Sequence, residues 1–558
     1  MRRHTLLVIA LLVVGAACSG GASAPTSAPP PTAVPDTTGA APATTTAPVA
    51  AGGYVNSLGS ILTFTDVTAG SGIDVLRQGA VSGVKTERET LVMRGGAAVG
   101  DFDGDGLPDL FVVGADERPD MLFRNLGDGT FTDVAEAAGL AGTVHMGSGA
   151  AVADADGDGD LDLYVTSHGP VGEFGPGGQL FFINQGDGTF VEGAEAAGVE
   201  TTSPRTGDGF GAAFGDIDLD GDLDLFVAGW QRDGDGNRLF RNEGDGTYRD
   251  ITLSMGIVDD NTRGFAPCLV DMNGDRLPEV LLVSDFGTTR YWVNRGDRFV
   301  ERTRQSGAGL EWSGMGTAVA DFDGTGTPDW FVTAIFDDQN EGRGVGDTLY
   351  LNGGRGDFTE VATEAGVADG EWGWGTVAAD FDLDGAVDIV EVNGWPLPAY
   401  QDTPAKLWMG DGTGAFTEVA ARAGLVHDHM ALTVVPIDFD LDGDIDLAIT
   451  STDGPLRLFR NDLAGADTHW LDVRLDPAGA SGIAPHGMGA TVTATAGDVE
   501  HTGFMAQCAN YLSGVEPSVH FGLGAVTTVD LTIEWADGVK QVVEGVAADQ
   551  RIVVEYGG

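Results

Sequence analysis

The chain between residues 61 and 462 repeats one pattern of apolar and polar positions seven times. Each copy begins with a small-residue apolar run, such as residues 96–100, and continues through an acidic loop into a second apolar run at 110–113. A third run at 121–125, a Gly-Asp-Gly turn and a fourth run at 130–134 follow. Four short strands with turn residues between them are the unit of a β-propeller blade. The pattern therefore predicts an all-β fold, a seven-bladed β-propeller over residues 61–462.

The ends of the repeat region indicate how the ring closes. The fourth-strand pattern follows an acidic loop only six times, at residues 130–134, 189–193, 247–251, 298–302, 357–361 and 415–419. The last copy stops after its third run at 458–461, and the missing fourth run stands at 62–67, before the first loop. We expect these two segments to pair, because this completes the seventh blade and leaves no exposed sheet edge.

The acidic loops begin at Asp101, Asp154, Asp216, Asp271, Asp321, Asp380 and Asp438, 50 to 62 residues apart. The loop that starts at Asp154 has carboxylates at positions 1, 3, 5 and 9 and glycine at position 6. Carboxylates this close repel one another unless a cation lies among them, and oxygen ligands in a flexible loop favour Ca²⁺. Apolar residues at position 12 and the absence of flanking helices distinguish these loops from an EF-hand. The alternative is that acidic turns merely solvate the hairpins.

The Asp-x-Asp-x-Asp-Gly-x-x-Asp loops inside blades resemble FG-GAP/VCBS repeats, the calcium-binding blades also seen in integrin α-chain propellers. A second domain at residues 468–556 carries His469-Trp470-Leu471, Gly487-Met488-Gly489-Ala490, Asn510-Tyr511-Leu512-Ser513, His520-Phe521-Gly522-Leu523-Gly524 and Trp535-Ala536-Asp537-Gly538. These landmarks resemble the ASPIC/UnbV domain, and the combination is similar to the cartilage-acidic-protein-like (CRTAC) family. The resemblance implies a β-propeller followed by a small β-rich domain.

The resemblance also implies that side chains at loop positions 1, 3, 5 and 9 bind Ca²⁺, together with the backbone carbonyl at position 7. Five loops carry complete sets: Asp101, Asp103, Asp105, Asp109; Asp154, Asp156, Asp158, Asp162; Asp216, Asp218, Asp220, Asp224; Asp380, Asp382, Asp384, Asp388; and Asp438, Asp440, Asp442, Asp446. Two further sets, for up to seven sites, are Asp271, Asn273, Asp275, Glu279 and Asp321, Asp323, Thr325, Asp329. Arg276 stands where glycine belongs, so we expect backbone strain and a like charge near that metal. Thr325 replaces a carboxylate, and weaker affinity is expected there.

The N-terminus has the form of an export signal. Arg2 and Arg3 precede an apolar run at residues 6–14 that is too short to span a bilayer. The run ends in Gly15-Ala16-Ala17-Cys18, which resembles a bacterial lipoprotein signal and implies lipidation of Cys18 and a membrane anchor. Residues 19–55, rich in Ala, Pro, Thr, Ser and Gly, predict a disordered tether. We therefore expect an exported protein at the cell surface or the periplasmic face.

Charge and cysteine content narrow the classes of partner. A net charge of −56 over 558 residues argues against nucleic acid, which is itself a polyanion. Three cysteines do not make a disulfide scaffold. Cys268 lies in an apolar run, which favours a buried inert thiol, and Cys508 could pair with it, an alternative that the sequence leaves open.

A candidate ligand face lies opposite the acidic loops, where the connections from each fourth strand to the next first strand gather. These connections carry Glu311, Trp312, Glu371, Trp372, His427 and His429. Exposed aromatics beside carboxylates suit a glycan or peptide ligand, although the tryptophans could instead pack between blades. Glu311 and Glu371 could form a glycosidase-like pair, and the two histidines could bind a transition metal or act as a base.

Three functions stay open. The first is a calcium-binding adhesion or binding module at the cell surface with a protein or glycan ligand, and we expect this one. The second is a lyase or hydrolase that acts on polysaccharide at the face opposite the acidic loops. In the third, the C-terminal domain binds a partner chain and the propeller presents it. The sequence has no Gly-x-Ser-x-Gly, His-Glu-x-x-His or phosphate-loop motif.

Overall fold

The computed structural model describes residues 53–557, apart from 74, 76–92, 115–118, 143–144, 171–177, 201–207, 231–235, 259–260, 338–344, 402, 428, 453 and 466–467. The expected signal at 1–18, its Cys18 and nearly all of the tether at 19–55 lie outside the described residues. Residues 51–558 form one compact unit. None of the helices in the described part is long and apolar enough to cross a bilayer.

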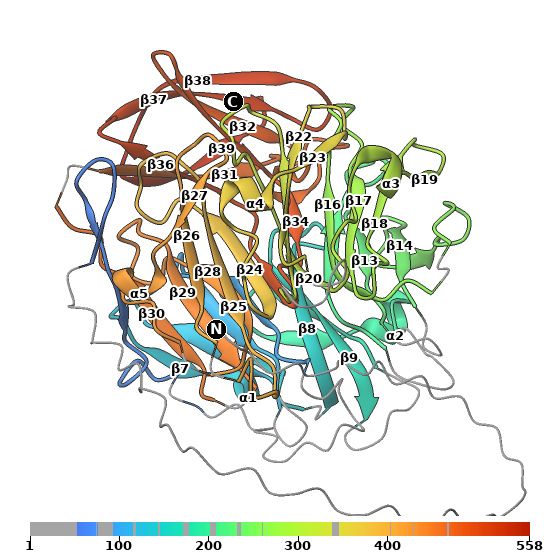
Figure 1. The fold of residues 1–558 in the computed structure, drawn as a ribbon. Helices are drawn as coiled ribbons and strands as arrows, with labels where there is room; N and C mark the ends of the chain where they lie inside the picture. The colour runs from blue at the N-terminus through green and yellow to red at the C-terminus, as the bar shows by residue number, and fades with distance from the viewer. Residues whose placement is uncertain are drawn as a thin grey trace, which may run out of the picture. The chain divides into compact units, whose positions relative to one another are not determined.

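Seven sheets, each built on four antiparallel strands and two of them extended by a fifth, follow one another along the described part of the chain (Figure 1). The first three are β4 (Ala97–Gly100), β5 (Asp109–Val112), β6 (Met121–Asn125), β7 (Phe131–Asp133); β8 (His145–Ala153), β9 (Asp162–Pro170), β10 (Leu180–Asn184), β11 (Phe190–Glu192); and β12 (Ala212–Gly215), β13 (Asp224–Val227), β14 (Arg238–Asn242), β15 (Tyr248–Asp250). The next two are β16 (Gly264–Val270), β17 (Glu279–Ser284), β18 (Arg290–Asn294), β19 (Phe299–Glu301); and β20 (Gly314–Ala320), β21 (Asp329–Ala334), β22 (Thr348–Asn352), β23 (Phe358–Glu360). The last two are β24 (Gly373–Ala379), β25 (Asp388–Asn393), β26 (Lys406–Gly410), β27 (Phe416–Glu418); and β28 (Ala431–Ile437), β29 (Asp446–Ser451), β30 (Arg457–Asn461) with β3 (Phe64–Asp66).

The sheets close into a ring through their first strands. Each first strand contacts the first strand of the next sheet, and β28 of the last sheet contacts β4 of the first. The N-terminal β3 supplies the fourth strand of the last sheet, with Phe64 opposite Asn461 and Asp66 opposite Phe459. The predicted pairing of these two segments is confirmed, and so is the all-β propeller fold.

Within the described residues, five helices of one turn each follow the fourth strands of the first, second, fourth, fifth and sixth sheets, and they were not predicted. They are α1 (Ala135–Ala138), α2 (Ala194–Ala197), α3 (Thr303–Ser306), α4 (Ala362–Ala365) and α5 (Ala420–Ala423). Each ends at a glycine in the left-handed region, such as Gly139 with φ of 86°. A side chain would be strained there, so the glycine fixes where the turn stops. A short hairpin, β1 (Tyr54–Val55) and β2 (Ile61–Leu62), precedes β3.

The C-terminal domain comprises two sheets around its own apolar core, which includes the fully buried Trp535. One sheet has the order β36 (Val519–Gly524), β31 (His469–Asp476), β39 (Gln550–Glu555). The other has the order β33 (Val499–Phe504), β32 (Thr491–Ala496), β37 (Thr528–Glu534), β38 (Lys540–Ala547). A short 3₁₀ turn spans Pro485–Gly487. This is the small β-rich domain that the sequence predicts.

Two short strands of the C-terminal domain belong to propeller sheets. β34 (Gln507–Cys508) adds to β16, and β35 (Ser513–Val515) runs parallel to β4. Cys268 lies directly opposite Cys508 and forms a disulfide with it. The expectation of an inert buried thiol at Cys268 is therefore wrong, because the apolar strand of Cys268 pairs with β34, which carries Cys508.

Asparagines at the ends of third strands connect neighbouring sheets. The side-chain amide of Asn184, for example, donates to Phe102 O of the preceding sheet (2.9 Å) and to Leu161 O of its own loop (3.1 Å). The same pair of hydrogen bonds recurs at Asn125, Asn242, Asn294, Asn352 and Asn461. Asn125 of the first sheet reaches Phe439 of the last, so the series runs across the closure. Gly410 takes this position in the sixth sheet.

We expect Asn184→Ala to lower stability by about 2 kcal/mol, because two buried carbonyls lose their donor. The matched control is Gln185→Ala, since Gln185 is the exposed neighbour and its removal leaves the junction between sheets intact. Differential scanning calorimetry in calcium-containing buffer measures the difference. Equal melting temperatures for the two variants would show that the asparagine does not hold the sheets together.

Candidate functional site

The acidic loops connect the first and second strands of the seven sheets. Position 9 of each loop is the first residue of a second strand, namely Asp109, Asp162, Asp224, Glu279, Asp329, Asp388 and Asp446. Because the sheets repeat one strand order around the ring, the loops gather at one face. We call this the loop face.

The position-9 carboxylate links each loop to its third strand. At Asp162, one oxygen accepts from Ala155 N at position 2 (3.0 Å) and the other from Asn184 N at the end of β10 (2.8 Å). All seven loops repeat this arrangement. Burial raises the pKa of Asp162 to about 8, although its backbone donors act in the opposite direction. A buried carboxyl of this kind holds a proton near neutral pH unless a cation replaces it.

The position-1 carboxylate fixes the turn of the loop. Asp216 accepts from the backbone N–H groups of Asp220 (3.2 Å) and Gly221 (3.0 Å), at positions 5 and 6. Burial raises its pKa to about 7. Asp101, Asp321 and Asp380 make the same two bonds. The turn therefore forms from the chain itself and brings the remaining carboxylates together.

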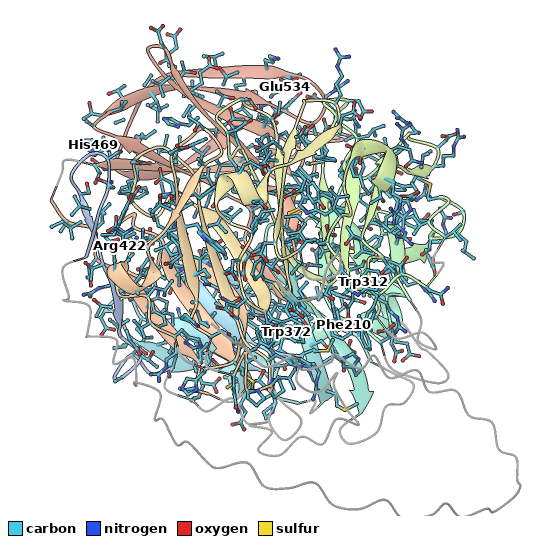
Figure 2. The ribbon with its side chains drawn as sticks, in the orientation of Figure 1. Phe210, Trp312, Trp372, Arg422, His469 and Glu534 are labelled. Carbon is cyan, nitrogen blue, oxygen red and sulfur yellow. A yellow bond between two sulfur atoms is a disulfide. The ribbon has the colours of Figure 1, made fainter. Side chains whose placement is uncertain are left out.

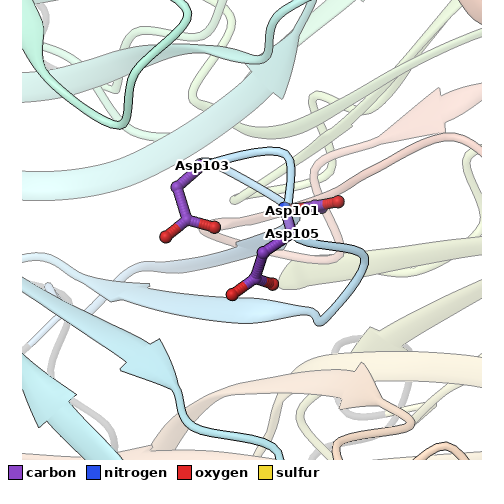
Figure 3. Close-up of side chains that lie close together, drawn as sticks. All are labelled: Asp101, Asp103 and Asp105. Carbon is purple, nitrogen blue, oxygen red and sulfur yellow. The ribbon is translucent and has the colours of Figure 1, made fainter.

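Several of these loops can hold a metal ion. In at least five of them three carboxylates each offer an oxygen within 4.8 Å of the others: Asp101, Asp103, Asp105; Asp154, Asp156, Asp158; Asp216, Asp218, Asp224; Asp321, Asp323, Asp329; and Asp380, Asp382, Asp388. Figure 3 shows Asp103 and Asp105 of the first loop with their carboxylates on the same side of the turn. The ligand roles of single residues at positions 3 and 5 stay predictions.

The unpaired oxygens of these loops fit a hard cation. Within the described residues, one buried oxygen each of Asp103, Asp218, Asp382 and Asp438 has no hydrogen-bond partner. A buried carboxylate oxygen without a donor is costly, and an oxygen-only donor set is the kind that Ca²⁺ takes. In the first loop Arg124 lies 2.5 Å from Asp103 and 3.1 Å from Asp105, so a cation there must displace the guanidinium.

Backbone strain in the loops is wider than predicted. Arg276 at position 6 has φ of 75°, so the predicted strain at this residue is confirmed. Position 4 is also left-handed, and Leu219, Leu383 and Leu441 hold φ of 59°, 55° and 58° there. The signal for this was present, because position 4 is glycine in the four other loops. Three loops therefore store strain at a leucine.

The C-terminal domain covers the loop face. Glu516 accepts from Asp101 N (3.3 Å), Gly524 donates its N–H to Leu383 O (2.9 Å), and His520 Nε2 lies 2.9 Å from Gly443 O. Gly443, at position 6 of the seventh loop, packs directly against the C-terminal domain. A Cβ on this residue would lie 2.0 Å from the indole of Trp470. Glycine is thus needed there for close packing as well as for φ.

A cavity of about 770 Å³ lies between the loop face and the C-terminal domain. Its walls include Asp380 and Asp438 of two loops and Arg474, His520 and Arg551 of the C-terminal domain.

The opposite face carries the candidate ligand residues. Trp372 stacks on Trp395 with ring centroids 4.9 Å apart and planes 7° apart, and Tyr400 meets Trp372 edge-on at 5.1 Å. We call these three residues the aromatic platform. All three are half-buried. In Figure 2 the labelled Trp372 and Trp312 lie far from the labelled Glu534 of the C-terminal domain.

Two of the predicted ligand-face residues, Glu311 and His427, are buried rather than exposed. Glu311 is 1% exposed and its Oε2 accepts from the Tyr350 hydroxyl at 2.5 Å. His427 is 2% exposed and its Nε2 lies 2.9 Å from Ser451 Oγ. Both side chains turn inward to satisfy strand residues, so neither is available to a ligand. Trp312, Glu371, Trp372 and His429 remain half-buried on this face.

A carboxyl pair that the sequence reasoning missed lies near the aromatic platform. Asp347 and Glu391 are both fully buried, and their carboxyls converge beside Gly370, where a Cβ would lie 2.3 Å from Asp347 and 2.2 Å from Glu391. Burial raises the pKa of Asp347 to about 8 and raises that of Glu391 well above its usual value. The pair therefore holds a proton at neutral pH. A glutamate inside the apolar second strand was the available signal.

Protein-family models match both the repeat region and the C-terminal domain. The family model described as FG-GAP-like repeat matches residues 101–165, 171–227, 216–282 and 271–332, and the model described as ASPIC and UnbV matches residues 481–558. Cartilage acidic protein 1 of Mus musculus is 23% identical over 485 residues, which are 82% of this chain and 64% of that protein. The Homo sapiens protein is 24% identical, over 82% of this chain and 62% of its own length. The chain thus spans just under two thirds of these relatives.

Similar solved structures are more distant. A lectin of Agrocybe aegerita that recognises non-reducing terminal N-acetylglucosamine has 19% identity and a TM-score of 0.37, over 67% of this chain and 86% of that one. The V. cholerae biofilm matrix protein Bap1 has 12% identity and a TM-score of 0.29, over 82% of this chain and 72% of that one.

Proposed function

Since the chain is an FG-GAP-repeat protein with a C-terminal ASPIC and UnbV domain, homologous to cartilage acidic protein 1, we propose that it is an exported calcium-binding propeller that binds a glycan or protein ligand. The repeats and the homology support an extracellular β-propeller. Lipid anchoring at Cys18 adds a membrane attachment to this proposal and rests on the sequence alone.

Calcium has a structural role in this proposal. The loops supply carboxylate and backbone oxygens, their turns form without the ion, and several buried oxygens have no other partner within the described residues. An ion in each loop would neutralise the clustered carboxylates and fasten the first strand to the second. The link from the loop to the third strand needs no ion, because the position-9 carboxylate makes it through hydrogen bonds.

One observation carries the choice of ligand surface: the C-terminal domain covers the loop face. Macromolecular ligands are therefore directed to the opposite face, where Trp372, Trp395 and Tyr400 are half-buried rather than enclosed. Flat aromatic surface stacks on the apolar face of sugar rings or on peptide side chains at little cost in side-chain entropy. The alternative function, a polysaccharide lyase or hydrolase, used Glu311 and Glu371 as its two carboxylates. Because Glu311 is buried, that pair is incomplete, and we favour binding without turnover.

The test is binding of the purified protein to a panel of immobilised oligosaccharides and extracellular-matrix proteins in calcium-containing buffer. We expect Trp372→Ala to weaken binding at least tenfold, because stacking on an aromatic anchor contributes about 2 kcal/mol. Val542→Ala is the control, since Val542 is 59% exposed on the C-terminal domain. Unchanged binding by Trp372→Ala, or no binding by the parent protein, contradicts the proposed function.

A further inference from the structure

A segment of the C-terminal domain runs through the middle of the propeller ring. Residues 505–516, here the channel segment, include β34 and β35, which pair with first strands of the fourth and first sheets. Between them, Asn510 O accepts from Thr376 N of the sixth sheet (3.1 Å) and Leu512 O from Ala150 N of the second (3.1 Å). A short segment bonded to four sheets around a ring must lie within that ring.

Glycines in the first strands or directly before them make room for this segment. A Cβ at Gly96 would lie 2.5 Å from Leu512 O, and one at Gly316 would lie 2.8 Å from Asn510 O. A Cβ at Gly211 would lie 2.9 Å from the Cβ of Ala509. Real Cβ atoms do not approach so closely, so three different sheets need glycine where the segment passes. The small-residue character of the first strands thus fits an occupied channel.

Tyr511, in the middle of the channel segment, contacts aromatic residues that lead to the face opposite the loop face. It is fully buried, and its hydroxyl donates to Met93 O at 2.8 Å. Its ring lies 5.0 Å from Trp374, which lies 5.7 Å from Trp395, the residue that stacks on Trp372. A continuous series of ring contacts therefore joins the C-terminal domain to the aromatic platform.

We propose that Tyr511 is a positioning residue for the ligand site, so that the C-terminal domain forms the floor of a site on the face opposite the one it covers. The inference about ligand affinity rests on the proposed function, whereas the positioning of Trp372 and Trp395 does not. Buried aromatic rings hold one another in place through their edges and faces. Without the Tyr511 ring, Trp374 and then Trp395 would move into the space that it leaves.

Fluorine NMR of the full-length protein labelled with fluorotryptophan tests the positioning directly. The chain has 10 tryptophans, whose signals are assigned by single Trp→Phe variants. We expect Tyr511→Leu to shift the signals of Trp372 and Trp395 and to leave that of Trp535 unchanged. Tyr556→Leu is the matched control, because the ring of Tyr556 lies 5.0 Å from Trp535 within the C-terminal domain. This control should shift the Trp535 signal alone.

Affinity for the ligand found on the oligosaccharide and matrix-protein panel is the second measurement. Tyr511→Leu should weaken binding roughly 2- to 10-fold, as expected from the loss of one aromatic pair, and Tyr556→Leu should not. A shift confined to Trp374 overturns the proposal, as does unchanged affinity. If no ligand binds, the fluorine signals still decide the positioning while the proposed function fails.

A milder variant keeps the test decisive if Tyr511→Leu does not fold. Tyr511→Phe removes only the hydroxyl bond to Met93 O, which frees the ring to tilt. Smaller shifts of the same two signals, Trp372 and Trp395, are then expected. Unchanged signals in this variant would overturn the positioning role.

Discussion

Chelation of calcium with EGTA is expected to lower the melting temperature by about 10 °C or more. At a free calcium concentration a hundred times the dissociation constant, each site adds about 2.7 kcal/mol, and five complete loops act together. The shift in melting temperature equals the summed stabilisation by the five sites divided by the entropy of unfolding. Because that entropy is large for a chain of this length, the expected shift is about 10 °C. Differential scanning calorimetry with calcium, and with EGTA at equal ionic strength, measures it.

Two substitutions in one loop serve as variant and control for this effect. Asp156→Ala removes the position-3 carboxylate and should reduce the calcium-dependent gain in melting temperature. Asp160→Ala, at position 7, keeps the backbone carbonyl and should retain the full gain, although it removes the same charge. An EGTA melt that equals the calcium melt would refute the structural role of the ion.

The calcium-dependent gain in stability is expected to grow as the pH rises from 5.5 to 8. In the metal-free protein, burial raises the pKa of Asp109 and Asp329 to about 7 and that of Asp162 to about 8, against an ordinary value of 3.8. The folded state thus holds protons that the unfolded state releases. This contribution to stability is complete below about pH 4 and is lost as the pH rises through 7 to 8.

The proposed calcium binding would reverse this trend, because the ion would take the deprotonated carboxylates. Melting temperatures in EGTA should therefore fall between pH 5.5 and 8, while those in calcium should change little or rise. Asp162→Asn imitates the protonated group: it should melt above the parent protein in EGTA at pH 8 and below it in calcium. Parallel pH profiles with and without calcium would contradict this expectation.

Some features followed from the sequence because they are local and periodic. Strand-and-turn chemistry recurs in each copy, and the displaced fourth strand could be matched to its partner because only one copy lacked it. The pairing of β3 with β30 confirms that reasoning. The strain at Arg276 was predictable because left-handed φ is a property of one residue.

Features that depend on distant segments did not follow. An asparagine such as Asn184 recurs at the end of the third runs. The carbonyl that accepts its hydrogen bond lies in the preceding sheet, however, and no periodic pattern in the sequence marks that carbonyl. The channel segment makes its contacts across hundreds of residues, and only the glycines of the first strands hinted at a close neighbour. Loop side chains such as Glu311 and His427 turn inward or outward according to partners on other strands, which no pattern of apolar positions reveals.

The central claim, that the crowded loop carboxylates are held together by calcium, is tested most directly by counting bound ions. Native mass spectrometry of the protein at increasing calcium concentration should show at least five bound ions, and Asp156→Ala should show one fewer than the parent protein. A parent protein that binds none at millimolar calcium would contradict the account.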